Sequence, residues 1–108
     1  MVTAALRFHN IKNWDNQPNE LYAHLLDITT LGVQQRTDNE GGGDYFAHTY
    51  TGVHEHLVTY QNLTTTPRDL VYNFDQTDLS ALNVYLADGR AGIGFDPDCH
   101  FYNDGVSL

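Results

Sequence analysis

Residues 68–89 read RDLVYNFDQTDLSALNVYLADG and contain two kinds of apolar periodicity, one after the other. In the first part, Leu70, Tyr72 and Phe74 are spaced two residues apart. A period of two places these side chains on one face of a strand, so we predict a half-buried strand over 68–75. Half-buried strands of this kind are the units of antiparallel β-sandwiches.

The second part of this stretch has helical periodicity and predicts a short helix over about residues 78–88. Thr77 is the expected N-cap, and Asp78 lies favourably in the first turn, near the positive end of the helix dipole. Gly89 is expected to end the helix. Three leucines fall at helical spacing between these ends, namely Leu79, Leu82 and Leu86. No other segment has a comparable helical pattern.

Short strand patterns recur along the rest of the chain, separated by turn-forming residues. They cover residues 4–11, 32–36, 45–50, 53–60, 91–95 and 105–108, with further apolar density over 21–28. About eight short strands and one helix predict a mainly β fold, an antiparallel β-sandwich or jelly roll. A chain of 108 residues has room for one modest core, so residues 1–108 are expected to form a single domain.

The acidic composition restricts the possible partners. The chain has 5 Lys and Arg against 14 Asp and Glu, and its formal net charge of −9 repels nucleic-acid phosphates and anionic lipid surfaces. No stretch approaches the ~20 apolar residues of a membrane helix. We therefore expect no nucleic-acid partner and no membrane insertion by this chain. Cys99 is the only cysteine, which excludes an intrachain disulfide and a thiolate zinc cluster.

Four segments, taken in order, resemble a known family. They are residues 13–16 (NWDN), 38–44 (DNEGGGD), 85–89 (YLADG) and 94–105 (GFDPDCHFYNDG). Together they are similar to the extracellular β-domain of bacterial PEP-CTERM proteins, the class that exosortases sort. The resemblance implies a secreted, jelly-roll-like module that is extracellular or at the cell surface. Targeting segments, and the sorting motif and apolar helix of that class, are expected outside this chain.

The loop near the C-terminus is rich in hard oxygen ligands. The residues concerned are Asp96, Asp98, Asn103 and Asp104. Ca²⁺ takes about six to eight oxygen ligands, so further donors are required. The natural donors are Asp38, Asn39 and Asp44 in the glycine-rich loop, or Asp15 and Asn16. The sequence thus predicts a Ca²⁺ site. The alternative is a set of ordinary surface turns, in which Asp and Asn side chains bond their own backbone.

Histidines suggest a different metal site. His54 and His56 lie two residues apart in a predicted strand and therefore share a face, whereas Glu55 points to the opposite face. With a third histidine they can bind Zn²⁺ or Cu²⁺. The candidates for the third ligand are His9, His24, His48 and His100. The alternative is that the pair occupies exposed polar positions. Cys99, beside His100, is expected to be a small buried hydrophobe rather than a nucleophile.

Exposed aromatic residues suggest a third kind of site, because Trp14 and Tyr102 can stack on sugar rings if they do not fill the core. We therefore expect a non-catalytic extracellular β-module, stabilised by Ca²⁺, that acts in matrix assembly or polysaccharide binding. Sheet edges would allow copies to self-associate into filaments. The alternative is a metal-dependent enzyme, an oxidoreductase or hydrolase, with a Zn or Cu site at His54, His56 and His100.

Overall fold

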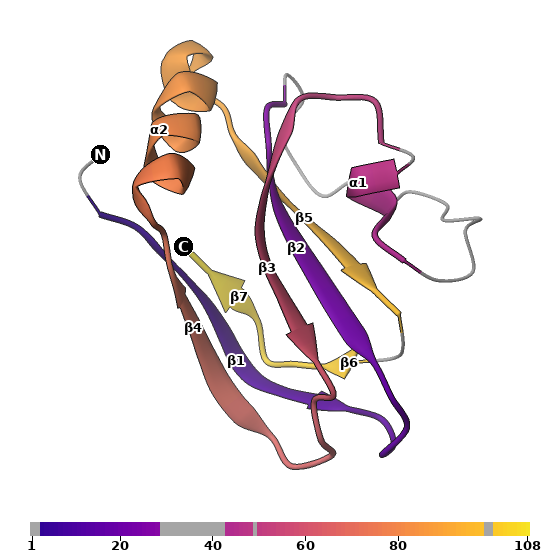
Figure 1. Cartoon of the computed structure of the whole chain (residues 1–108). Helices are drawn as coiled ribbons and strands as arrows, with labels where there is room; N and C mark the ends of the chain where they lie inside the picture. Colours follow the sequence, from indigo (N-terminus) through magenta and orange to yellow (C-terminus); the bar gives the residue numbers. More distant parts are fainter. Residues whose placement is uncertain (1–2, 29–42, 49, 99–100) are drawn as a thin grey trace.

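Two antiparallel sheets form the framework of the protein (Figure 1). The computed structural model describes residues 3–28, 43–48, 50–98 and 101–108. In chain order the elements are β1 (Ala5–Asn13), β2 (Glu20–Leu26), α1 (Tyr45–His48), β3 (His54–Gln61), β4 (Arg68–Asn73), α2 (Gln76–Tyr85), η1 (Leu86–Asp88), β5 (Gly92–Pro97), β6 (Phe101–Tyr102) and β7 (Val106–Ser107). The predicted mainly β fold, an antiparallel sandwich with one short helix, is confirmed.

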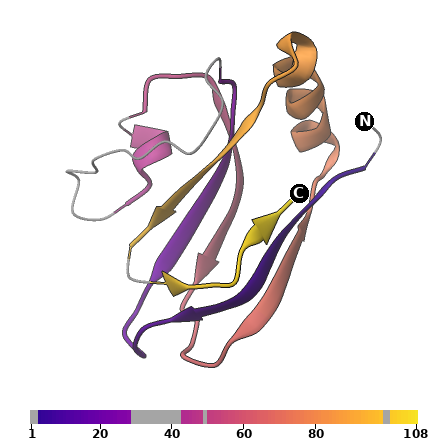
Figure 2. The same ribbon diagram turned by 180° about the vertical axis from the view of Figure 1, so that it is seen from behind.

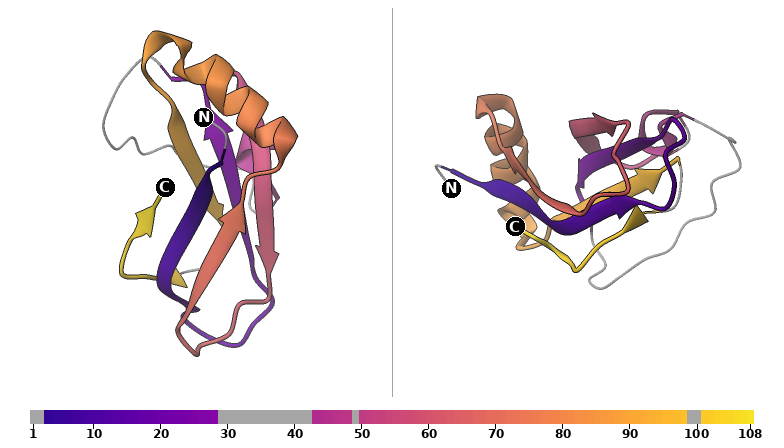
Figure 3. Two further views of the ribbon diagram at one scale, coloured as in Figure 1. Left: turned by 90° about the vertical axis from the view of Figure 1, so that its left-hand side faces the viewer. Right: turned by 90° about the horizontal axis from the view of Figure 1, so that it is seen from below.

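Each sheet is built around one central strand. β1 pairs with β4 on one side and with β6 and β7 on the other, while β2 lies between β3 and β5. Figure 2, which views the molecule from behind, shows β6 and β7 beside β1. α2 follows β4 of the first sheet and leads to β5 of the second, and it lies along one end of the space between the sheets (Figure 3). The predicted half-buried strand over 68–75 is β4.

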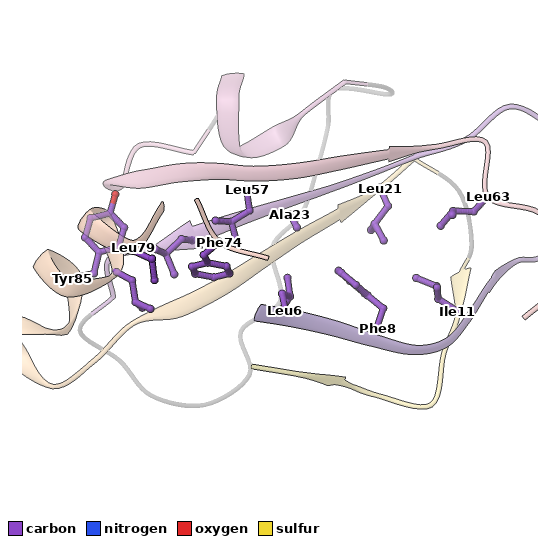
Figure 4. Packing of buried hydrophobic residues seen from close by; sticks show 12 residues of the cluster. Leu6, Phe8, Ile11, Leu21, Ala23, Leu57, Leu63, Phe74, Leu79 and Tyr85 are labelled. Carbon is purple, nitrogen blue, oxygen red and sulfur yellow. The ribbon is translucent and has the colours of Figure 1, made fainter. Parts of the chain in front are cut away.

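The core lies between the two sheets and follows the alternation of the strands. Leu6 and Phe8 of β1 are each 1% exposed, and they face the inner side chains of β2, which include Leu21 and Ala23 (Figure 4). α2 adds apolar side chains to the same cluster, namely Leu79, Leu82 and Tyr85. Because alternate residues of a strand point to opposite faces, the other side chains of β2 lie on the outer face of its sheet.

α2 begins two residues earlier than predicted, and its N-cap is Asp75 rather than Thr77. The Asp75 carboxylate accepts a 2.8 Å hydrogen bond from the Asp78 amide, and the Asp78 carboxylate accepts one from the Asp75 amide, which is a capping box. Tyr72 of β4 also donates its hydroxyl to Asp78. This bond to the preceding strand favours a start at Asp75. Gly89 ends η1 in the left-handed region, at a φ of 84°, as the sequence predicts.

The cap can be tested by two alanine substitutions at neighbouring polar positions. Asp75→Ala removes the acceptor for the Asp78 amide and should lower the free energy of unfolding by about 1 kcal/mol. Thr77→Ala is the control, because Thr77 is exposed and lies inside the first turn. We expect it to change stability by less than about 0.5 kcal/mol in urea unfolding. A larger loss from Thr77→Ala would restore Thr77 as the cap.

Two further differences concern local structure. The strand predicted over 45–50 is wrong, because residues 45–48 form the single helical turn α1. The Asp44 carboxylate accepts a hydrogen bond from the Phe46 amide and so starts a helical turn where the apolar pattern indicated a strand. β6 was not predicted as a strand, and the strand predicted over 32–36 lies outside the described residues. Within the described ranges, no helix is long and apolar enough to span a bilayer.

Candidate metal site

The outer face of the β3–β2–β5 sheet carries a cluster of histidines beneath α1. Figure 4 shows α1 on the side of this sheet that faces away from the core. His24 of β2 lies opposite His56 of β3 on one side and opposite Gly94 of β5 on the other. His24 is only 1% exposed, because α1 covers it. A buried polar ring on a covered outer face needs specific partners.

A register shift in β3 brings His56 to this face. Ala23 lies opposite Val58, but its neighbour His24 lies opposite His56, so Leu57 is an extra residue on β3, as in a β-bulge. Leu57 and Val58 both pack with the core, and the alternation of β3 is inverted beyond them. His56 therefore joins His24 on the outer face. The sequence indicated a shared face for His54 and His56, but it contains no signal for the bulge.

Both ring nitrogens of His24 have partners. Nε2 lies 2.6 Å from Oδ2 of Asp44, and Nδ1 lies 3.0 Å from Nδ1 of His54. Burial lowers the pKa of His24 below its ordinary value, against the opposing effect of the hydrogen bond and charge of Asp44. A neutral imidazole is the form that binds metal ions. His24 is therefore held in a fixed orientation between a carboxylate and a second imidazole.

Asp44 is fixed by the turn that it starts. Its Oδ1 accepts a 3.0 Å hydrogen bond from the Phe46 amide, which leaves Oδ2 directed at His24. The Phe46 ring packs beside the His24 ring, with centroids 5.4 Å apart, and lies directly over Gly94. A Cβ at Gly94 would lie 2.5 Å from the Phe46 ring, so only glycine allows this approach. Gly94 thus permits α1 to place Asp44 at His24.

Three of these residues meet the distance requirement of a metal site. One ligand atom from each of His24, Asp44 and His56 lies within 4.8 Å of the other two. Asp44 is buried whereas His56 is exposed, and the Nε2 of His56 lies 2.8 Å from the hydroxyl of Thr59. Two imidazoles and one carboxylate form a ligand set for Zn²⁺ and for other first-row divalent ions. Among the described residues, the structure thus groups His24 with His56, and Asp44 takes the place that the sequence prediction gave to His54. The candidate His100 lies outside the described residues.

The oxygen ligands predicted for Ca²⁺ are distributed over both sheets. Asp96 and Asp98 lie at the end of β5 and accept hydrogen bonds from the amides of Tyr45 and Gly43, at 2.7 and 3.2 Å. These bonds bring them to the same segment as Asp44. The other two residues, Asn103 and Asp104, lie against the first sheet.

At the first sheet, the amide oxygen of Asn103 accepts from the Gly105 amide, and the Asp104 carboxylate accepts from the side-chain amide of Asn10. The first bond is typical of an ordinary polar turn, and the second links this turn to β1. Asp38, Asn39, Cys99 and His100 lie outside the described residues, so the structure does not place them. The Ca²⁺ site therefore stays a prediction.

The two aromatic residues considered for sugar binding are both exposed. Trp14 is 54% exposed and Tyr102 is 57% exposed. Tyr102 lies opposite Lys12 in the pairing of β6 with β1, and the Lys12 ammonium is 5.6 Å from the centre of its ring. Trp14 follows β1 directly and belongs to the same end of that sheet. This region lies on a different sheet from His24.

Comparison with known proteins adds no relative to this description. No family model matches the chain, and no significant match is found among curated proteins or solved structures. The resemblance to the PEP-CTERM β-domain therefore stays a prediction.

Proposed function

We propose that this chain is a metal-binding β-domain that holds Zn²⁺ through His24, Asp44 and His56. The single observation that carries the proposal is the convergence of three ligand atoms, from β2, β3 and the residue before α1, within 4.8 Å. Each atom comes from a different segment of the chain. Such a site can form only when both strands and the turn are in place, so binding the ion would stabilise the folded state.

The proposal has a purely structural competitor, in which Asp44 and His24 form a buried pair that secures α1 to the sheet. That competitor accounts for the 2.6 Å contact between the two side chains. It does not account for His56, which is exposed and yet lies within ligand distance of both. The nitrogen ligands favour Zn²⁺ over Ca²⁺, because Ca²⁺ is bound almost entirely by oxygen.

Thermal unfolding with and without zinc tests this function. If the site binds Zn²⁺, free ion at ~100 times its Kd should stabilise the protein by about 2.7 kcal/mol and raise Tm by several degrees. EDTA should reverse the shift, and elemental analysis of the purified protein should find about one ion per chain. Cu²⁺ alone is a poor test, because it binds most nitrogen sites more tightly than the other ions do. An unchanged Tm with Zn²⁺, Fe²⁺ and Co²⁺ would leave only the structural pair.

Gly94→Ala tests whether the contact between α1 and the sheet builds this site. The added methyl group would displace the Phe46 ring and, with it, the turn that carries Asp44. We expect zinc affinity to fall about tenfold and stability to fall by about 1–3 kcal/mol. Gly92→Ala is the matched control on the same strand, because the three atoms nearest to its Cβ all belong to the Ile28 side chain, at 3.0–3.5 Å, and none of them belongs to α1. Isothermal titration should show near-normal zinc affinity for Gly92→Ala.

A second candidate function is the Ca²⁺-stabilised extracellular module that the sequence predicts. One observation favours it. Asp96 and Asp98 accept hydrogen bonds from the amides of Tyr45 and Gly43, so the described residues 43–45 and 96–98, which carry three aspartates, lie side by side. In that case Ca²⁺, and not Zn²⁺, should raise Tm, and EGTA should reverse the effect.

The surface role of such a module would be polysaccharide binding, through Trp14 and Tyr102, or self-association at sheet edges. A glycan array with the wild-type protein and with Trp14→Ala tests the first role. Size-exclusion chromatography with and without Ca²⁺ tests the second. If neither metal ion changes Tm, neither metal-binding function stands.

A further inference from the structure

We infer that the ion held by His24, Asp44 and His56 keeps a coordination position open to solvent, which a small anion or the oxygen of a substrate can occupy. This inference rests on the proposed zinc site and specifies what that site is for. A closed site with four protein ligands would serve stability alone, whereas an open site can bind and activate an exogenous molecule.

The first step is the number of protein ligands. Zn²⁺ in structural sites almost always has four protein ligands, and in catalytic sites it has three plus water or substrate. Among the described residues, the group within ligand distance contains three members. His54 lies close to the group, but it contacts the other side of the His24 ring. Nε2 of His24 faces Asp44, whereas Nδ1 of His24 lies 3.0 Å from Nδ1 of His54. His54 is therefore placed to orient His24 from behind rather than to bind the ion.

The second step is the asymmetry of burial around the three ligands. His24 is 1% exposed and Asp44 is 8% exposed, so the sheet and the turn close the site on their side. His56 is exposed and lies on β3, at an edge of its sheet. An ion bound by all three would lie between a buried side and the solvent near His56. The missing ligand would approach from that direction.

The third step is the local charge. Zn²⁺ with one carboxylate and two neutral imidazoles has a net charge of +1, which attracts an anion or polarises an oxygen atom. The chain as a whole has a formal charge of −9, but salt screens charges beyond about 10 Å at 0.1 M ionic strength. The ligand class that fits is therefore a small anion, or a neutral carbonyl or water oxygen, rather than a polyanion.

Cobalt substitution of the full chain tests the inference without assuming any reaction. Co²⁺ replaces Zn²⁺ in such sites, and its visible absorption bands report the number and type of ligands. We expect added azide to shift these bands in a saturable manner, as the azide replaces water on the ion. Bands that azide leaves unchanged would mean that protein groups fill every position, and the inference would be overturned.

Two variants separate this outcome from failure of the zinc site itself. His56→Ala should remove the cobalt bands, whereas His9→Ala, on the other sheet, should keep both the bands and the azide shift. If the wild-type protein shows no cobalt bands, the proposed function fails and the open position fails with it. If the bands are present and depend on His56 but ignore azide, the zinc site stands and only the open position is wrong.

Discussion

Phe8→Ala is expected to lower the free energy of unfolding by about 3–5 kcal/mol, the usual range for loss of a fully buried phenylalanine. Phe8 is 1% exposed and lies between the sheets. Its ring makes edge contacts with Tyr60 of β3 and Phe95 of β5, each at 5.6 Å between centroids. The substitution therefore removes contacts with two strands of the opposite sheet at once. Urea unfolding, followed by fluorescence and circular dichroism, measures the loss.

Val71→Ala provides the control from the same sheet. Val71 lies on β4 and is 46% exposed, so its side chain points away from the space between the sheets. We expect a change of less than about 0.5 kcal/mol. Equal losses from the two substitutions would mean that the sheets do not pack through Phe8, which would contradict the sandwich.

The strands were predictable where one face is buried and the other is not. β1 and β4 have this alternation, and their predicted limits differ from the observed ones by at most two residues. Segment 45–50 has a similar apolar content, but its described helical turn, residues 45–48, lies on the outside of the sandwich, where local hydrogen bonds decide the conformation. There the Asp44 carboxylate accepts hydrogen bonds from the amides of Phe46 and Ala47, and these bonds form a helical turn in place of the strand that the periodicity indicates.

The start of α2 illustrates a different limit of sequence analysis. Asp75 and Thr77 are both good N-cap residues by residue type. Asp75 is favoured by Asp78, three residues further on, whose carboxylate accepts from the Asp75 amide and completes a capping box. Tyr72 of the preceding strand donates its hydroxyl to Asp78 as well, and this added contact is not visible in the spacing of the helix itself.

The members of the candidate site were recognised separately in the sequence but not as one group. Asp44 was assigned to a Ca²⁺ site, His54 and His56 to a transition-metal site, and His24 was one of four possible third ligands. Their convergence depends on the pairing of β2 with β3 and on the extra residue at Leu57. Neither is encoded in residue spacing, because a shift of one residue moves every later side chain to the opposite face.

His56→Ala should lower zinc affinity at least ~100-fold, since loss of even an outer-shell partner commonly costs ~10–100-fold and His56 is proposed to bind the ion directly. The fold should be preserved, because the His56 side chain is exposed and its described hydrogen bond is to the hydroxyl of Thr59 on the same strand. We therefore expect the apo protein to unfold within about 0.5 kcal/mol of the wild type. Competition with a chromophoric chelator measures the affinity, and urea unfolding measures the stability.

His9→Ala is a close match for this substitution. His9 also has its Nε2 bonded to a hydroxyl, that of Ser107 at 2.9 Å, but it lies on β1 in the other sheet. Loss of one partly exposed histidine is thus common to both variants, and only His56→Ala removes a proposed ligand. Zinc affinity should stay at the wild-type value in His9→Ala. His56 is assigned as a ligand because its ligand atom lies within 4.8 Å of those of His24 and Asp44. Equal zinc affinities in His56→Ala and His9→Ala would therefore mean that any bound zinc lies elsewhere on the chain.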